Sequence, residues 1–225
     1  MNDILAIIFD MDGVLVDTYR AHYRSWLEVA KPEGILFSEA DFALTFGRTS
    51  REIIAHFWGQ GRYNDAQIAE LDAEKEAAFR EIIATDFPDM PGVHKLLADL
   101  HVADWRIALG SSGPPENVEL VLDRLGKADL FGAVVTGMDV TRGKPDPQVF
   151  LLAAQRLAVP APRCVVVEDA QPGVAAAQAA GMAAVGLVST GRTHEELAAA
   201  DVVVSSLSDI SPQLLRDLVD RRGTK

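Results

Sequence analysis

The sequence is poor in cysteine, in long apolar runs and in positive charge. Cys164 is the only cysteine among 225 residues, which excludes a fold held by disulfides and favours a reducing, cytoplasmic compartment. No apolar run approaches the about 18 residues that a membrane span needs. Residues 1–9 also lack the positive region and the length of a signal peptide, so we expect neither secretion nor membrane insertion.

The charge balance restricts the classes of partner. The chain has 21 Lys and Arg against 33 Asp and Glu, a formal net charge of −12 and a pI near 4.8. Its only basic cluster is Arg221–Arg222 near the end, so nothing indicates nucleic-acid binding. An anionic substrate would have to be held by local positive charge. With 48% apolar residues, the chain can build a full core in one or two domains.

Hydrophobic patterning predicts an α/β fold with a helical insertion. The short apolar run 4–9 is typical of a buried strand. Helical spacing then covers 18–30, 38–45, 49–58 and 64–84, with no further strand. From residue 91 onward, β-rich runs alternate with helices, and this alternation predicts a Rossmann-like parallel sheet. The later strands are expected at 106–109, 133–136, 164–167, 184–188 and 202–204, and helices are expected to begin at Pro115, Pro147, Pro172, Thr193 and Pro212.

An irregular segment as long as residues 16–89 is improbable inside a compact domain. This helical segment should therefore be an inserted domain. We predict an α/β phosphotransfer core domain of residues 1–15 and 90–225 and a helical cap domain of residues 16–89. A monomer is the default expectation.

Polar residues follow the predicted strands where ligands bind in open α/β sheets, just beyond the carboxyl ends. These segments are Asp10 with Asp12, Gly110-Ser111-Ser112-Gly113, Gly143-Lys144-Pro145 and Glu168-Asp169. Each residue alone could be an ordinary turn, cap or surface residue. Four acids at one sheet edge, however, repel one another unless a cation lies among them. Oxygen ligands of this kind suit Mg²⁺.

In this order, the four segments resemble the motifs of the haloacid dehalogenase superfamily of phosphotransfer enzymes. The resemblance covers almost the whole chain and includes the position of the helical insertion. It implies that Asp10 is the nucleophile that attacks phosphorus and that Asp12 is the general acid and base. Ser111 would hydrogen-bond the transferring phosphoryl group, and Lys144 would neutralise it. The implied Mg²⁺ ligands are Asp10, the backbone carbonyl of Asp12, and Asp169, with Glu168 beside them.

These residue types also make chemical sense without the resemblance. A carboxylate can accept a phosphoryl group and form an acyl phosphate, which divides one displacement into two steps. Fixed donors and cations then stabilise the developing charge. Asp12 can reach the leaving group only if the chain bends back after Met11, and Gly13 permits such a bend.

Polar residues also interrupt apolar faces of the inserted helices. Lys75 falls on the apolar stripe of helix 64–84, and His22 shares a face with Trp26. Any one of them could be an ordinary core or rim residue. Together they resemble the sugar-phosphate contacts of the β-phosphoglucomutase-like branch of the superfamily. The substrate-binding residues that this resemblance implies are His22, Trp26, Gly47, Arg51 and Lys75, with Ser112 and Asn117 from the core.

The leading hypothesis is a Mg²⁺-dependent phosphatase that acts on a small phosphorylated metabolite. The resemblance favours a sugar phosphate as that metabolite. A sugar phosphomutase shares every core residue and returns the phosphoryl group to a sugar instead of to water. A halide-releasing dehalogenase would need neither Asp12 nor the acid pair Glu168-Asp169. A signalling receiver also collects acids and a lysine at a sheet edge, but it would have no use for a cap.

Overall fold

The computed structural model describes residues 4–223 and divides into two compact units. Unit 1 comprises Met1–Asp17 and Asp89–Lys225, and unit 2 comprises Thr18–Pro88. The sequence-based boundaries, at residues 16 and 89, differ from these by at most two residues. Residues 1–3, which entered the argument about a signal peptide, lie outside the described part of the chain, as do residues 224–225.

Unit 1 is built on a six-stranded parallel sheet with the strand order β3-β2-β1-β4-β5-β6. This confirms the predicted Rossmann-like α/β class. The strands are β1 (Ala6–Phe9), β2 (Arg106–Gly110), β3 (Phe131–Val135), β4 (Cys164–Glu168), β5 (Ala183–Leu187) and β6 (Val202–Val204). The chain runs from β1 outward through β2 and β3, and then returns to the other side of β1 with β4. The direction of winding therefore reverses between β1 and β4.

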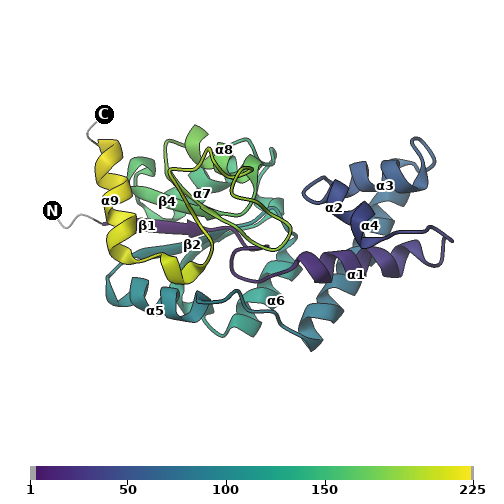
Figure 1. Cartoon of the computed structure of the whole chain (residues 1–225), viewed down its shortest axis with the longest axis horizontal. Helices are drawn as coiled ribbons and strands as arrows, with labels where there is room; N and C mark the ends of the chain where they lie inside the picture. Colours follow the sequence, from purple (N-terminus) through teal and green to yellow (C-terminus); the bar gives the residue numbers. More distant parts are fainter. Residues whose placement is uncertain (1–3, 224–225) are drawn as a thin grey trace. The chain divides into compact units, whose positions relative to one another are not determined.

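Helices cover both faces of the sheet (Figure 1). Helices α7 (Gln148–Leu157) and α8 (Gln171–Ala179) pack on one face. On the other, α5 (Val93–Val102) contacts β2, and α9 (Pro212–Gly223) contacts β4 and β5. Helix α6 (Pro115–Leu125) follows β2, and short 3₁₀ turns complete the unit at Ala128–Leu130, Gly137–Asp139, Ala161–Arg163 and Leu207–Asp209. Burial on both faces explains why the strands are apolar throughout rather than alternating.

The strand side chains divide between two apolar layers. Ala6 and Ile8 of β1 pack with Val166 of β4 and Phe150 of α7 in one fully buried cluster. The intervening Ile7 points to the opposite face of the sheet and is buried as well, because helices cover that face too. The strand ends that carry polar residues are thus held by a rigid apolar core.

Unit 2 consists of the helices α1 (Tyr19–Ala30), α2 (Glu39–Thr45), α3 (Ser50–Trp58) and α4 (Asp65–Thr85). They enclose an aromatic core that includes Trp26, Phe37, Phe42 and Trp58. Three of the helices begin with reciprocal capping boxes, formed by Ser38 with Asp41, Thr49 with Glu52, and Asn64 with Gln67. Each box satisfies two backbone N–H groups at a helix start, so local sequence fixes these boundaries.

The predicted helix at Thr193 does not form. The Thr193 and Glu196 side chains make the hydrogen bonds of a capping box, yet residues 194–199 form successive turns. The backbone N–H groups of Ala198 and Ala200 donate to carbonyls three residues back rather than four. The segment must return to β6 at Val202, which leaves no room for a continuous α-helix.

Within residues 4–223, no helix is long and apolar enough to cross a membrane. Cys164 is fully buried at the start of β4, and burial raises the pKa of its thiol to about 12. The thiol is therefore protonated and unreactive in the folded protein.

Candidate active site

The polar residues after β1 and β4 meet at the point where the winding of the sheet reverses. In doubly wound folds this switch point is where ligands bind, because the loops from neighbouring strands diverge to opposite faces there. Asp10 follows β1, and its backbone N–H donates to the Val167 carbonyl of β4 at 3.0 Å. Glu168 closes β4 and Asp169 follows it. Pairing of two strands therefore brings three carboxylates together from positions far apart in the sequence.

Lys144 lies between two of these carboxylates. Its Nζ donates to Oδ1 of Asp10 at 2.5 Å and to Oε1 of Glu168 at 2.6 Å. The lysine is also mostly buried and lies 4.9 Å from the centre of the Phe150 ring. Burial opposes its charge, but the two carboxylates outweigh that cost and raise the pKa of Lys144. Lys144 therefore stays charged throughout the physiological pH range.

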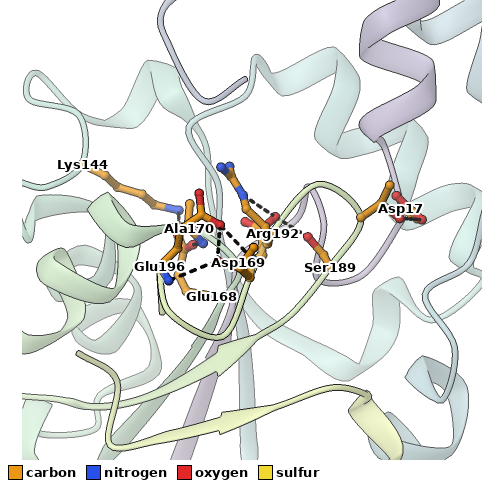
Figure 2. Close-up of polar contacts among 10 residues, drawn as sticks. Asp17, Lys144, Glu168, Asp169, Ala170, Ser189, Arg192 and Glu196 are labelled. Atoms are coloured by element: carbon orange, nitrogen blue, oxygen red, sulfur yellow. Dashed lines mark hydrogen bonds and ion pairs between the residues drawn. The ribbon is translucent and has the colours of Figure 1, made fainter. Parts of the chain in front are cut away.

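Asp169 is held by residues from the loop after β5. The Ser189 hydroxyl donates to Oδ2 of Asp169 at 2.7 Å, and Nε of Arg192 lies 3.6 Å from the same oxygen. Figure 2 shows both side chains directed at Asp169, with Glu168 and Lys144 on its other side. Sequence reasoning missed Ser189 and Arg192. They follow a predicted strand, so the rule that identified the other segments also applies to them.

Burial makes the acidic groups hard to ionise. It raises the pKa of Glu168 to about 7, against the opposing effect of Lys144. It raises the pKa of Asp169 to about 6, where Arg192 opposes the shift and the charge of Asp10 adds to it. The pKa of Asp10 is raised as well, first by burial. Together the carboxylates carry more negative charge than Lys144 and Arg192 compensate.

Asp10, Glu168 and Asp169 fit a divalent cation. Each offers one carboxylate oxygen, and these three oxygens lie within 4.8 Å of one another. All three residues are buried, and burial raises the pKa of each, so a cation among them would favour their charged forms. Hard oxygen ligands that leave positions open for water and phosphate are typical of Mg²⁺ sites.

The chain bends sharply after Asp10. Such a bend is the condition for the Asp12 side chain to reach the leaving group. Gly13 has φ +74°, the left-handed conformation that glycine adopts without strain. Its N–H donates to the Val16 carbonyl at 2.8 Å, and the N–H of Leu15 donates to the Met11 carbonyl at 2.9 Å. A Cβ atom on Gly13 would lie 2.1 Å from Oδ2 of Asp169. Gly13 thus serves both the bend and the space for Asp169.

The loop after β2 places Ser111 at the same edge of the sheet. Its side chain is buried, and its Oγ accepts a hydrogen bond from the Gly113 N–H at 2.9 Å. Ser112 beside it is exposed, whereas Asn117 is buried in α6. The loop is braced by Gly137, whose N–H donates to the Gly113 carbonyl at 2.9 Å.

Gly173 is a further residue that sequence reasoning missed. A Cβ atom there would lie 1.9 Å from the carboxyl carbon of Glu168. The Glu168 carboxylate therefore occupies the space beside the first turn of α8, where its Oε2 accepts the Ala170 N–H at 3.0 Å. A glycine one residue after Pro172, in the first turn of a helix, is the sequence signal for such a close approach.

Within unit 2, three of the predicted substrate-binding residues form one cluster. Lys75 is 3% exposed, and its Nζ lies 2.8 Å from Nδ1 of His22 and 2.6 Å from Oε1 of Glu76. It also lies over the rings of Trp26 and Phe79, at 5.8 and 5.3 Å from their centres. Helices α1 and α4 pack together and so bring these residues into contact. Glu76 was missed by sequence reasoning.

Of the other two predicted residues of unit 2, Gly47 lies in the loop between α2 and α3, and Arg51 lies in the first turn of α3. Gly47 is exposed and has φ +91°. The Arg51 side chain is 59% exposed, and its guanidinium donates to Asp65 of α4 at 2.8 Å. Arg51 is therefore engaged on the surface of unit 2.

The fold and this site define a family. A family profile for haloacid dehalogenase-like hydrolases matches residues 4–181. The chain belongs to this family, and the prediction of a haloacid dehalogenase-like phosphatase is confirmed.

Individual relatives show which branch of the family the chain resembles. β-Phosphoglucomutase of Bacillus subtilis is 35% identical over 219 residues, which cover 94% of each chain. Fructose-1-phosphate phosphatase of Escherichia coli is 36% identical over 184 residues, or 80% of this chain and 94% of the relative. The crystal structure of β-phosphoglucomutase from Clostridium difficile matches with a TM-score of 0.86 at 26% identity, covering 99% of this chain and all of the other. The predicted likeness to the β-phosphoglucomutase-like branch is thus confirmed.

Gly173→Ala tests the close approach of Glu168. Helix propensity alone predicts that alanine stabilises α8 by about 0.5–1 kcal/mol. The added methyl group would instead collide with the Glu168 carboxylate, and overpacking of this kind costs about 1–3 kcal/mol. We expect a lower free energy of unfolding in urea. Gly143→Ala is the matched control, because its Cβ meets no atom within 4 Å. A Gly173→Ala variant more stable than the parent would contradict the geometry.

The raised pKa values predict a pH-dependent affinity for Mg²⁺. Below pH 6, Glu168 and Asp169 are largely protonated, and a cation must displace those protons before it binds. Mg²⁺ should therefore raise the melting temperature more at pH 7.5 than at pH 5.5, with a loss of affinity at the lower pH of roughly tenfold or more. NaCl at equal ionic strength is the control. Equal Mg²⁺ shifts at both pH values would show that these carboxylates do not bind the cation.

Proposed function

We propose that the protein is a Mg²⁺-dependent phosphatase that hydrolyses a small sugar phosphate through an aspartyl phosphate on Asp10. The observation that carries this proposal is the contact of Lys144 with both Asp10 and Glu168 at the switch point of the sheet. The buried ammonium group of Lys144 offsets negative charge on two carboxylates: that of Asp10, the proposed nucleophile, and that of Glu168, which does not react. Family membership and relatives named as phosphatases support the same reaction.

In the first half of the reaction, a carboxylate oxygen of Asp10 attacks phosphorus and the bond from phosphorus to the leaving oxygen breaks. Asp12 donates a proton to that oxygen, so the sugar leaves as a neutral alcohol. Lys144 and the Ser111 hydroxyl stabilise the negative charge on the phosphoryl oxygens during the transfer. The bend at Gly13 allows Asp12 to act two residues after the nucleophile.

In the second half, Asp12 accepts a proton from water as that water attacks the phosphorus of the acyl phosphate. The bond between phosphorus and the Asp10 oxygen breaks, which regenerates the carboxylate and releases inorganic phosphate. Asp10, the Asp12 backbone carbonyl and Asp169 would hold Mg²⁺, with Glu168 beside them. The cation supplies positive charge that neutralises the carboxylates and the phosphoryl oxygens.

The substrate class rests on relatives and on the cluster in unit 2. One relative is named as a fructose-1-phosphate phosphatase and another as a β-phosphoglucomutase. We propose that His22, Trp26 and Lys75 bind the part of the substrate that is not transferred, together with Gly47, Arg51, Ser112 and Asn117. An aromatic ring beside a lysine and a histidine offers both an apolar surface and donors for hydroxyl groups.

A sugar phosphomutase is the second candidate, favoured by the 35% identity to the Bacillus subtilis enzyme over 94% of the chain. It would use the same core residues but return the phosphoryl group to a sugar hydroxyl. The mutase would be identified if a sugar 1-phosphate were converted into an isomeric sugar phosphate without net release of inorganic phosphate. We also propose that the protein acts as a cytoplasmic monomer, in keeping with its single, buried cysteine.

The covalent step is tested by labelling with radioactive acetyl phosphate in the presence of Mg²⁺, followed by an acid quench. Asp10→Asn should remain unlabelled, because an amide is a poor nucleophile. Asp12→Asn should accumulate nearly stoichiometric label, because hydrolysis of the acyl phosphate loses its base, an effect of about 10²–10⁴-fold. Label in Asp10→Asn at the level of Asp12→Asn would refute the assignment of the nucleophile.

The role of unit 2 is tested by kcat/KM on a hexose phosphate and on p-nitrophenyl phosphate. Lys75→Ala and Arg51→Ala should lower the value for the sugar phosphate far more than for the aryl ester, since they contact only the untransferred part. Lys144→Ala should lower both values alike and is the matched lysine control. Equal losses on both substrates in Lys75→Ala and Arg51→Ala would show that these residues are structural.

A further inference from the structure

Arg192 and Ser189 belong to the loop that follows β5 and reach the carboxylate of Asp169 together. Ser189 Oγ donates to Oδ2 at 2.7 Å, and Arg192 Nε lies 3.6 Å from the same atom. The arginine side chain is 13% exposed and that of Asp169 is 6% exposed. This is a buried ion pair, like those of Lys144 and unlike the exposed pairs Arg51–Asp65 and Arg62–Glu33.

Three groups enclose Oδ2 of Asp169. Besides Ser189 and Arg192, the backbone of Gly13 approaches so closely that a Cβ atom there would lie 2.1 Å from Oδ2 and 3.0 Å from the Ser189 hydroxyl. Oδ2 therefore already accepts one hydrogen bond and faces one cationic side chain. The cluster with Asp10 and Glu168 takes one oxygen from each residue, and we expect Oδ1 to be the one that Asp169 offers.

Arg192 also changes the charge of the sheet edge. The four acids Asp10, Asp12, Glu168 and Asp169 face the two cationic side chains Lys144 and Arg192. With Asp12 protonated for its role as general acid, the three remaining carboxylates still outnumber the two cationic side chains. A cation-binding carboxylate that is itself hydrogen-bonded has a fixed orientation, and loss of such support typically costs 10–100-fold in metal affinity.

We propose that Arg192 and Ser189 are positioning residues that restrict Asp169 to one-oxygen coordination and thereby select Mg²⁺ over Ca²⁺. Small Mg²⁺ requires strict octahedral geometry with single oxygens, whereas Ca²⁺ accepts six to eight oxygens and two-oxygen carboxylates. A carboxylate with one oxygen held inside the protein suits the first ion and disfavours the second. This inference rests on the proposed Mg²⁺ site and adds the residues that set its selectivity.

The test measures the affinities for Mg²⁺ and for Ca²⁺ by calorimetry, without reference to turnover. Arg192→Met and Ser189→Ala free Oδ2, so each should lower the ratio of Mg²⁺ to Ca²⁺ affinity by roughly tenfold or more. The added negative charge in Arg192→Met strengthens the attraction of both ions, and the ratio therefore isolates the geometric effect. Ser189→Thr keeps the hydroxyl and should retain the parent ratio.

Arg156→Met is the matched control, because it removes an arginine that pairs with Asp139, away from the acidic cluster. It should leave the ratio unchanged. If Arg192→Met and Ser189→Ala fold but keep the parent ratio, the positioning role is wrong while the Mg²⁺ site stands. If the parent protein binds Mg²⁺ no more tightly than an Asp10→Asn variant, the proposed metal site fails, and the selectivity role fails with it.

Discussion

Lys144 donates to carboxylates of Asp10 and Glu168, at 2.5 and 2.6 Å, at the edge where β1 and β4 end. These contacts depend on the parallel pairing of two strands whose sequences are more than 150 residues apart. The pairing itself depends on a core that buries both faces of the sheet. Buried like charges are costly, and a protein keeps them only where counter-charges and hydrogen bonds compensate. Most of the other features of the edge supply that compensation.

The compensation comes from several elements. The Glu168 carboxylate fits beside α8 because position 173 is glycine, and the Ala170 N–H donates a hydrogen bond to it. Asp169 is held by the loop after β5 and fits only because position 13 is glycine. Even so, the pKa values of Glu168 and Asp169 remain at about 7 and 6. The protein itself therefore compensates the burial of these carboxylates only in part, and a divalent cation would favour their charged forms.

The fold could be predicted from the sequence because its signals are local. Apolar runs mark the strands, and side chains such as Thr49 and Glu52 fix a helix start within four residues. The same signal misled at Thr193, where the side-chain hydrogen bonds form but the path to β6 prevents a helix. Contacts between distant residues were less accessible. Nothing in the sequence states that Ser189 and Arg192 reach Asp169.

The polar residues of the candidate site belong to two groups, one in each unit. The carboxylates, Lys144 and Ser111 all belong to unit 1, on loops that a rigid sheet positions. Unit 2 contributes Lys75 in contact with His22, Glu76 and aromatic rings. Under the proposed function, such a division would let the residues of unit 2 vary with the substrate while the residues proposed for phosphoryl transfer stay fixed.

The central claim is that the edge of the sheet holds one divalent cation between Asp10 and Asp169. Crystals grown with MnCl₂, measured at a wavelength where manganese scatters anomalously, test it most directly. The account predicts a single strong anomalous peak at about 2.1 Å from one oxygen of Asp10 and one oxygen of Asp169, with Lys144 still paired to Asp10. A fully formed acidic cluster without such a peak, or manganese bound only elsewhere, would contradict it.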